Sequence, residues 1–132
     1  MKIDEIKTLF QSSSMVFCIA GFGGNTGTTI TPIISEIAKE FGLFTISIVT
    51  KPFLFEGNKK NNIVKSGIIK LDRSSDSIII FDNNKLLPLL DENSTLKEAF
   101  KMIDVVLVEN IIDKIKFYTS ICNNYLSRNL EI

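Results

Sequence analysis

The sequence predicts an α/β fold in which a short parallel sheet of about three strands is flanked by helices and followed by a long C-terminal helix. Three short apolar runs have the length and composition of buried strands, and they occupy residues 15–20, 44–50 and 77–81. Segments with helical periodicity separate these runs, so the strands are expected to pair in parallel through right-handed crossovers. The runs are continuously apolar, which indicates a sheet covered on both faces.

Two helices are expected around the first strand. Between Lys2 and Phe10 apolar side chains recur at helical spacing, and the serines at 12–14 end the segment. Proline is best tolerated in a first helical turn, so Pro32 predicts that the second helix starts near residues 28–31. Gly42 suits a left-handed cap at the end of this helix. The apolar stripe of this helix comprises Ile30, Ile33, Ile34, Ile37, Ala38 and Phe41.

Two further helices complete the predicted fold. One spans residues 59–71, between the second and third strands. The other is long and begins at a capping box formed by Thr95 and Glu98. A three-stranded sheet has limited surface for burying a helix with two apolar stripes, so we expect a partner surface on the long helix. Its second stripe comprises Val105, Val108 and Ile112.

Length, charge and composition narrow the classes of function. A chain of 132 residues is expected to form one domain with its own core. Its 15 basic and 15 acidic side chains cancel without forming blocks, so we expect no nucleic-acid partner and no direct membrane insertion. Cys18 and Cys122 lie in apolar segments and no signal pattern is visible, which predicts a cytoplasmic protein with two buried thiols. The absence of histidine excludes a Ser-His-Asp triad and a Cys-His dyad.

The most informative segment is the turn at residues 21–29, rich in glycine and threonine, which joins the first strand to the next helix. Glycines let the backbone approach an anion, and the free amides of a helix start donate to it. Thr26, Thr28 and Thr29 can add hydroxyl donors or cap the helix. The missing Gly-Lys-Ser/Thr ending excludes a Walker P-loop, and the missing acidic residue after the second strand argues against a nicotinamide cofactor. The alternative interpretation is that the glycines only let the chain turn and pack between the strand and the helix, as in any α/β protein.

Two motifs in the chain point to a known family. Residues 20–29 read Ala-Gly-Phe-Gly-Gly-Asn-Thr-Gly-Thr-Thr, and residues 49–57 read Val-Thr-Lys-Pro-Phe-Leu-Phe-Glu-Gly. Together they resemble FtsZ, the bacterial tubulin-like cell-division GTPase family, with its Gly-Gly-Gly-Thr-Gly-Thr-Gly loop and Pro-Phe-x-Phe-Glu-Gly segment. The likeness continues through residues 81–87 and 96–100. It implies a partial Rossmann-like three-layer sandwich, with residues 1–132 forming a single truncated GTPase domain that lacks the family's N-terminal strands and C-terminal domain.

The resemblance also implies a nucleotide site. Glu56 matches the family's acidic residue at the ribose, and Asp104 matches an acidic position that looks toward the guanine base. Lys60 stands where the family usually has arginine near the nucleotide. Without the resemblance, Glu56 could equally well be a solvated loop charge, and Asp104 would be interpreted as an ordinary exposed helix charge. The implied cofactors are GTP or GDP with Mg²⁺, no residue is assigned as catalytic or as a metal ligand, and the positions that match the phosphate loop are Gly23, Gly24, Asn25, Thr26, Gly27 and Thr28.

Departures from the family pattern bear on activity. Asn25 and Thr29 stand where the family has glycines. Family members also carry an Asn-x-Asp-x-x-Asp pattern in a loop after the long helix, and its aspartates act on the nucleotide of a neighbouring subunit. This chain has no such pattern there. One hypothesis is therefore a GTP-binding protein of the bacterial cell-division cytoskeleton, located in the cytoplasm and at the division site, with weak or no hydrolysis alone. The alternative is a non-catalytic module that docks on a full-length FtsZ-like protein or self-associates. A third is a truncated product without function.

Overall fold

The computed structural model describes residues 3–86, 88, 93 and 95–130. The chain divides into two compact units, Met1–Leu87 and Pro88–Ile132, and each is described by itself. The first unit holds the sheet and the glycine-rich turn, so it contains most of the candidate site.

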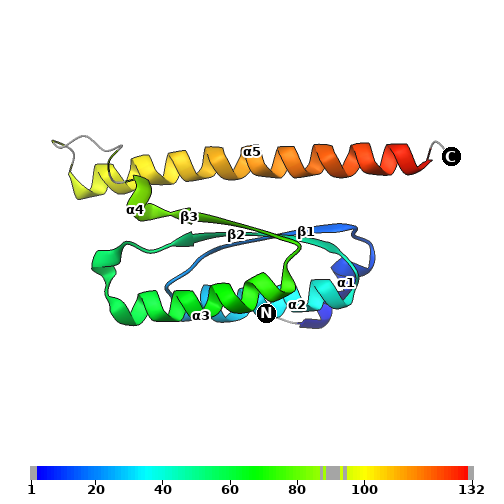
Figure 1. Ribbon diagram of the computed structural model, residues 1–132, viewed down its shortest axis with the longest axis horizontal. Helices are drawn as coiled ribbons and strands as arrows, with labels where there is room; N and C mark the ends of the chain where they lie inside the picture. Colours follow the sequence, from blue (N-terminus) through cyan, green and yellow to red (C-terminus); the bar gives the residue numbers. More distant parts are fainter. Residues whose placement is uncertain (1–2, 87, 89–92, 94, 131–132) are drawn as a thin grey trace. The chain divides into compact units, whose positions relative to one another are not determined.

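The first unit is built on a parallel sheet of three strands, β1 (Met15–Gly21), β2 (Phe44–Lys51) and β3 (Ser77–Asp82). The strands lie in the order β1-β2-β3, and the pairing begins with Met15 opposite Phe44 and Ile46 opposite Ser77 (Figure 1). The predicted α/β fold, with a short parallel sheet, flanking helices and a long C-terminal helix, is thereby confirmed.

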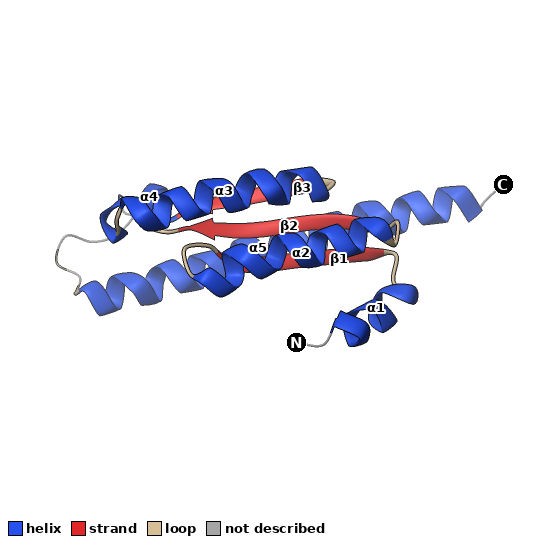
Figure 2. Cartoon of the chain, turned by 90° about the horizontal axis from the view of Figure 1, so that it is seen from below, coloured by secondary structure: helices blue, strands red, loops and turns tan. Residues whose placement is uncertain are grey.

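Two helices, α2 (Asn25–Glu40) and α3 (Asn58–Ser74), cover one face of this sheet (Figure 2). Two clusters of buried apolar side chains form the core, and most residues of the central strand β2 are buried. One cluster comprises Phe22, Val49, Val64 and Leu71, and the other comprises Phe10, Ala38 and Leu43.

The N-terminal helix α1 (Ile3–Gln11) precedes β1, as its periodicity predicts. Phe10, the buried residue of this helix, meets Phe41 edge to face, with 6.1 Å between the ring centroids. Gly42 has φ 73°, which confirms the left-handed cap predicted after α2.

The predicted start of the second helix, near residues 28–31, is wrong. Helix α2 begins at Asn25, so Pro32 lies well inside it and not in its first turn. Pro32 has no N–H for the Thr28 carbonyl, which would otherwise accept it. Helix α3 passes close to this carbonyl at Gly67, where a Cβ would lie 3.3 Å from the Thr28 oxygen and 2.5 Å from its methyl group. Packing between the two helices therefore holds the first turns of α2 in place despite the proline.

Cys18 lies buried in β1 as a free thiol, whereas the side chain of Cys122 falls outside the described part of the chain. Burial raises the pKa of the Cys18 thiol to about 11, and a hydrogen bond with Ser47 opposes that increase. This thiol is consequently protonated and unreactive at neutral pH.

The second unit contains α5 (Leu96–Leu130), the long C-terminal helix. Its capping box is confirmed, because Glu98 N–H donates to Thr95 Oγ1 and Thr95 N–H donates to Glu98 Oε2, both at 3.2 Å. Across the described residues, no helix combines the length and apolar character needed to cross a membrane. The second apolar stripe of α5 is exposed, at 57% for Val105, 54% for Val108 and 44% for Ile112, as a partner surface requires.

Candidate phosphate-binding site

The carboxyl ends of the three strands meet at one edge of the sheet. Gly21 lies opposite Thr50, and Lys51 lies opposite Asp82. In open parallel sheets with helical crossovers, ligands bind beyond this edge. The segments that leave it are the glycine-rich turn, the 3-10 helix η1 (Leu54–Glu56) and the short helix α4 (Asn83–Leu86).

The glycine-rich turn is held in position at both ends. Phe22 anchors its start, because the ring is buried in the core and the N–H donates to the Thr50 carbonyl at 3.0 Å. Gly23 has φ 125°, which favours glycine, and its N–H donates to Thr28 Oγ1 at 3.0 Å. Thr28 is itself buried. The structure thus gives the Thr28 hydroxyl a role in holding the turn.

The start of α2 presents backbone donors without a side-chain cap. Gly24 is the N-cap residue in an extended conformation, and its carbonyl accepts the Thr28 N–H at 3.3 Å. The amides of Asn25, Thr26 and Gly27 precede that first helical bond and have no carbonyl within the helix to bind. No acidic side chain occupies the first turn, so the positive end of the helix dipole is not neutralised there. This arrangement suits an anion.

The glycines of the turn serve different purposes. A Cβ on Gly27 would lie 2.7 Å from the Gly21 carbonyl oxygen, so the close approach of α2 to the end of β1 requires glycine. A Cβ on Gly23 would lie 3.5 Å from Pro52. A Cβ on Gly24, by contrast, would meet nothing within 4 Å. Gly27 and Gly23 therefore shape the turn, whereas Gly24 leaves open space beside the free amides.

Glu56 and Lys60, both predicted site residues, lie next to each other. Glu56 Oε2 accepts the Phe53 N–H at 2.7 Å, and Glu56 Oε1 lies 3.3 Å from Lys60 Nζ. Phe53 is buried and its ring stacks on Phe55 at 4.9 Å, which fixes the base of this segment. The carboxylate is therefore oriented by its own turn and by a partly exposed ion pair, an interaction worth at most about 1 kcal/mol.

Asn84 connects the segments around the edge, and sequence reasoning assigned it no role. The Leu54 N–H donates to Asn84 Oδ1 at 2.9 Å, and Asn84 Nδ2 donates to the Pro52 carbonyl at 3.3 Å and to Asp82 Oδ1 at 2.8 Å. The signal that could have found it is the Asp-Asn-Asn sequence that begins at the last residue of β3, because such residues hydrogen-bond their own backbone in turns.

Asn83, beside it, was also missed. Its Oδ1 is buried and has no hydrogen-bond partner among the described residues. A buried acceptor without a partner is unfavourable, so this atom is a candidate contact for a donor on a ligand. The remaining predicted residue, Asp104, is exposed on α5 in the second unit.

Comparison with known proteins identifies the family. A model of the tubulin/FtsZ family GTPase domain matches residues 1–91. The chain belongs to the tubulin/FtsZ family. The cell division protein FtsZ of Coxiella burnetii is 46% identical over 115 residues, which cover 85% of this chain and 30% of that relative. FtsZ of Helicobacter pylori strain J99 is 43% identical over 108 residues, which cover 82% of this chain and 28% of that protein.

Solved structures share the fold of this chain. An empty FtsZ dimer from M. jannaschii matches with a TM-score of 0.75 and 38% identity over 82% of this chain and 31% of that one. CetZ1 from Haloferax volcanii, a GDP-bound monomer, matches with a TM-score of 0.65 at 18% identity and shares the fold. It covers 81% of this chain and 31% of that chain. The chain thus spans less than a third of the length of these relatives.

Proposed function

We propose that this chain is a GTP-binding protein of the bacterial cell-division machinery and that it holds the phosphates of GTP or GDP at the start of α2. The observation that carries the proposal is the start of α2, which has no side-chain cap and where a side chain on Gly24 would meet nothing within 4 Å. Membership of a GTPase family supports the choice of nucleotide over other anions.

In this proposal the backbone of the glycine-rich turn binds the phosphates. The amides of Asn25, Thr26 and Gly27 donate to phosphate oxygens, and the helix dipole adds favourable charge. The hydroxyls of Thr26 and Thr29, both exposed, are further donors. Because Gly23 is already bound to Thr28, the turn needs little reorganisation when a phosphate arrives.

The ribose would use the neighbouring segments of the first unit. Glu56, oriented by the Phe53 amide, accepts from the ribose hydroxyls, and the unpartnered Oδ1 of Asn83 accepts from a further donor of the nucleotide. The partly exposed ion pair between Lys60 and Glu56 can be broken at little cost in free energy. Lys60 would then contribute positive charge near the phosphates. Asp104 would accept from the guanine ring. Mg²⁺ would be held by the phosphates.

Hydrolysis by the isolated chain should be weak or absent. The free amides can stabilise charge that develops on the phosphates, but no described side chain is assigned to position the attacking water. In the proposal a neighbouring subunit supplies that group. Release of inorganic phosphate from GTP, measured on the purified chain, tests this point, and turnover that follows the amount of enzyme would contradict it.

Binding itself is tested by isothermal titration of the purified chain with GTP and Mg²⁺. The loop variant is Gly24→Trp, which places a large side chain in the open space beside the amides. The matched control is Leu9→Trp, which adds the same residue at an exposed position of α1. Saturable binding that persists in the control and disappears in the loop variant supports the proposal. A folded wild-type chain that binds no GTP would overturn it.

A second candidate function is a non-catalytic module that docks on a full-length FtsZ-like protein or on itself. The observation in its favour is that β1 lies at the edge of the three-stranded sheet, where its outer backbone groups can accept another strand. Location in the cytoplasm and at the division site belongs to both candidates. Co-sedimentation with a full-length FtsZ, with and without GTP, separates them: complex formation without GTP binding by this chain favours the module.

A further inference from the structure

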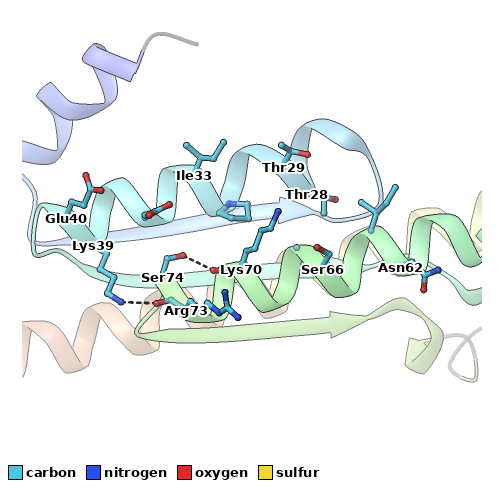
Figure 3. A pocket seen from close by; sticks show the side chains of 14 residues that line it. Thr28, Thr29, Ile33, Lys39, Glu40, Asn62, Ser66, Lys70, Arg73 and Ser74 are labelled. Atoms are coloured by element: carbon cyan, nitrogen blue, oxygen red, sulfur yellow. Dashed lines mark hydrogen bonds between the residues drawn. The ribbon is translucent and has the colours of Figure 1, made fainter.

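A groove of about 1040 Å³ runs between α2 and α3 on the side of these helices that faces away from the sheet (Figure 3). Pro32, Ile63 and Gly67 contribute its small and apolar surface. Each helix presents one stripe of residues along the groove, at the spacing of successive helical turns. The stripe of α2 comprises Thr29, Ile33, Glu36 and Glu40, and the stripe of α3 comprises Asn62, Ser66, Lys70 and Arg73.

The two sides of the groove carry opposite charges. Glu36 and Glu40 are exposed on α2, and Lys70 and Arg73 are exposed on α3. Lys39 also comes from α2, but its ammonium reaches the Arg73 carbonyl and therefore adds to the basic side. Among the described residues, no ion pair joins the acidic side chains to the basic ones. The charges of both sides are therefore available to an external partner.

The charged stretches lie at the same end of the groove. Ser35 Oγ donates to the Ser74 carbonyl at 3.0 Å. Lys39 Nζ donates to the Arg73 carbonyl at 2.9 Å (Figure 3). Helices α2 and α3 both start at the edge where the strands end and run in the same direction. The two hydrogen bonds therefore fix the position of α2 along the axis of α3. Glu36 of α2 and Arg73 of α3 therefore lie at similar heights along the two helices.

We propose that this groove binds a second copy of the same chain. A two-fold axis that runs along the groove, parallel to the helices, places α2 of each copy opposite α3 of the other and brings the acidic stripe of one copy against the basic stripe of its partner. An axis that crosses the helices would instead place α2 opposite α2 and α3 opposite α3, so the acidic stripe would not meet the basic one. The charge pattern therefore selects one symmetric arrangement.

Ile33 supplies the apolar anchor of this contact. It is 47% exposed on the outer ridge of α2, between Thr29 and Glu36. In the symmetric pair it enters the partner's groove over the small surface left by Gly67. A large exposed aliphatic side chain flanked by complementary charges is the composition expected at the centre of a specific interface. The amides of Asn25, Thr26 and Gly27 are not part of this contact, so pairing can be tested without nucleotide.

Charge reversal tests the proposal on the full chain. The acid-reversed variant carries Glu36→Lys and Glu40→Lys, and the base-reversed variant carries Lys70→Glu and Arg73→Glu. Light scattering after size exclusion gives the mass at about 100 μM, where a micromolar interaction is saturated. We expect a dimer for the wild type and monomers for both variants. An equimolar mixture of the two variants should again form a dimer, because each reversed stripe then meets its complement.

The control variant carries Asp4→Lys and Glu5→Lys, exposed on α1, which changes the net charge by the same amount as the acid reversal. It should remain a dimer. Circular dichroism checks that each variant is folded, which is expected because every substituted side chain is exposed. A monomeric wild type, a reversal that leaves the dimer intact, or a mixture that stays monomeric would overturn the proposal. GTP titration of the same samples reports separately on the proposed function.

Discussion

Replacing Gly24 with aspartate tests whether the amides at the start of α2 are the anion site. Gly24 is an N-cap residue in an extended conformation, and a side chain there would meet nothing within 4 Å. The new carboxylate can therefore accept from the amides of Thr26 or Gly27, the donors proposed for phosphate. A better cap and a favourable charge at the helix start should raise the free energy of unfolding by about 0.5–1 kcal/mol.

The same substitution should weaken GTP binding. Each phosphate contact that the carboxylate replaces is a charge-assisted hydrogen bond worth about 1.5–3 kcal/mol, so Kd should rise by roughly 10- to 150-fold before repulsion between the two anions is counted. Thermal unfolding followed by circular dichroism measures the first effect, with an expected rise in Tm of about 2–4 °C. Titration calorimetry with GTP measures the second. Greater stability with weaker binding is the signature of amides shared between cap and ligand.

The matched control is Gly24→Ala, which adds a Cβ in the same open space but no acceptor and no charge. Alanine is a poorer N-cap than glycine, so the free energy of unfolding should fall, by up to about 1 kcal/mol, while saturable GTP binding persists. The reasoning is refuted if the aspartate variant binds GTP as tightly as the wild type, or if it is less stable than the alanine variant.

Three further predictions concern the architecture of the first unit. Gly27→Ala should lower the free energy of unfolding by about 1–3 kcal/mol, because its Cβ would lie 2.7 Å from the Gly21 carbonyl oxygen. Urea denaturation measures this free energy, and a decrease no larger than that of Gly24→Ala would contradict the prediction. Asn84→Ala removes the hydrogen bonds to Leu54, Pro52 and Asp82 and should lower the free energy of unfolding by about 1–3 kcal/mol. The control, Asn62→Ala at an exposed position, should lower it little. Equal decreases in the two variants would contradict the prediction. The buried Cys18 thiol, whose pKa is about 11 against an ordinary 9.0, should make stability fall as pH rises through that range, because the unfolded thiol deprotonates first. Two proteins are compared, one with Cys18 and one with Cys18→Ala, and both carry Cys122→Ala. As pH rises through that range, the free energy of unfolding of the protein with Cys18 should fall by roughly 2–3 kcal/mol relative to the other. A difference that does not change with pH would contradict this.

The strands, the helices and the left-handed cap could be predicted from local patterns. The apolar runs of β1, β2 and β3 are long enough to mark strands, and the stripe of α2 repeats at helical spacing. Of the three, β2 is largely buried, whereas Ile19 of β1 and Ile80 of β3 are exposed, so the predicted cover on both faces holds for the central strand alone. Gly42 follows the last turn of α2, where a left-handed residue is common, and its φ of 73° agrees. These features depend on residues close together in the sequence.

The start of α2 could not be predicted in this way. Pro32 favours a later start by its local preference, but packing of α3 against α2 at Gly67 outweighs that preference. The partners of the site residues depend likewise on contacts across the fold. Asn84 meets Pro52 only because β2 and β3 pair in a particular register, and Thr28 meets Gly23 only because the turn folds back on the helix. The roles assigned to Glu56, Lys60 and Asp104 by resemblance stay predictions.

The most direct test of the central claim is titration of the wild-type chain with GTP and Mg²⁺ in a calorimeter. The account predicts saturable binding that is retained in the Leu9→Trp control and lost in Gly24→Trp, because only the second substitution fills the space beside the amides at the start of α2. A wild-type chain that is folded by circular dichroism and releases no heat of binding at any GTP concentration tried, with equilibrium dialysis also showing none bound, would contradict it.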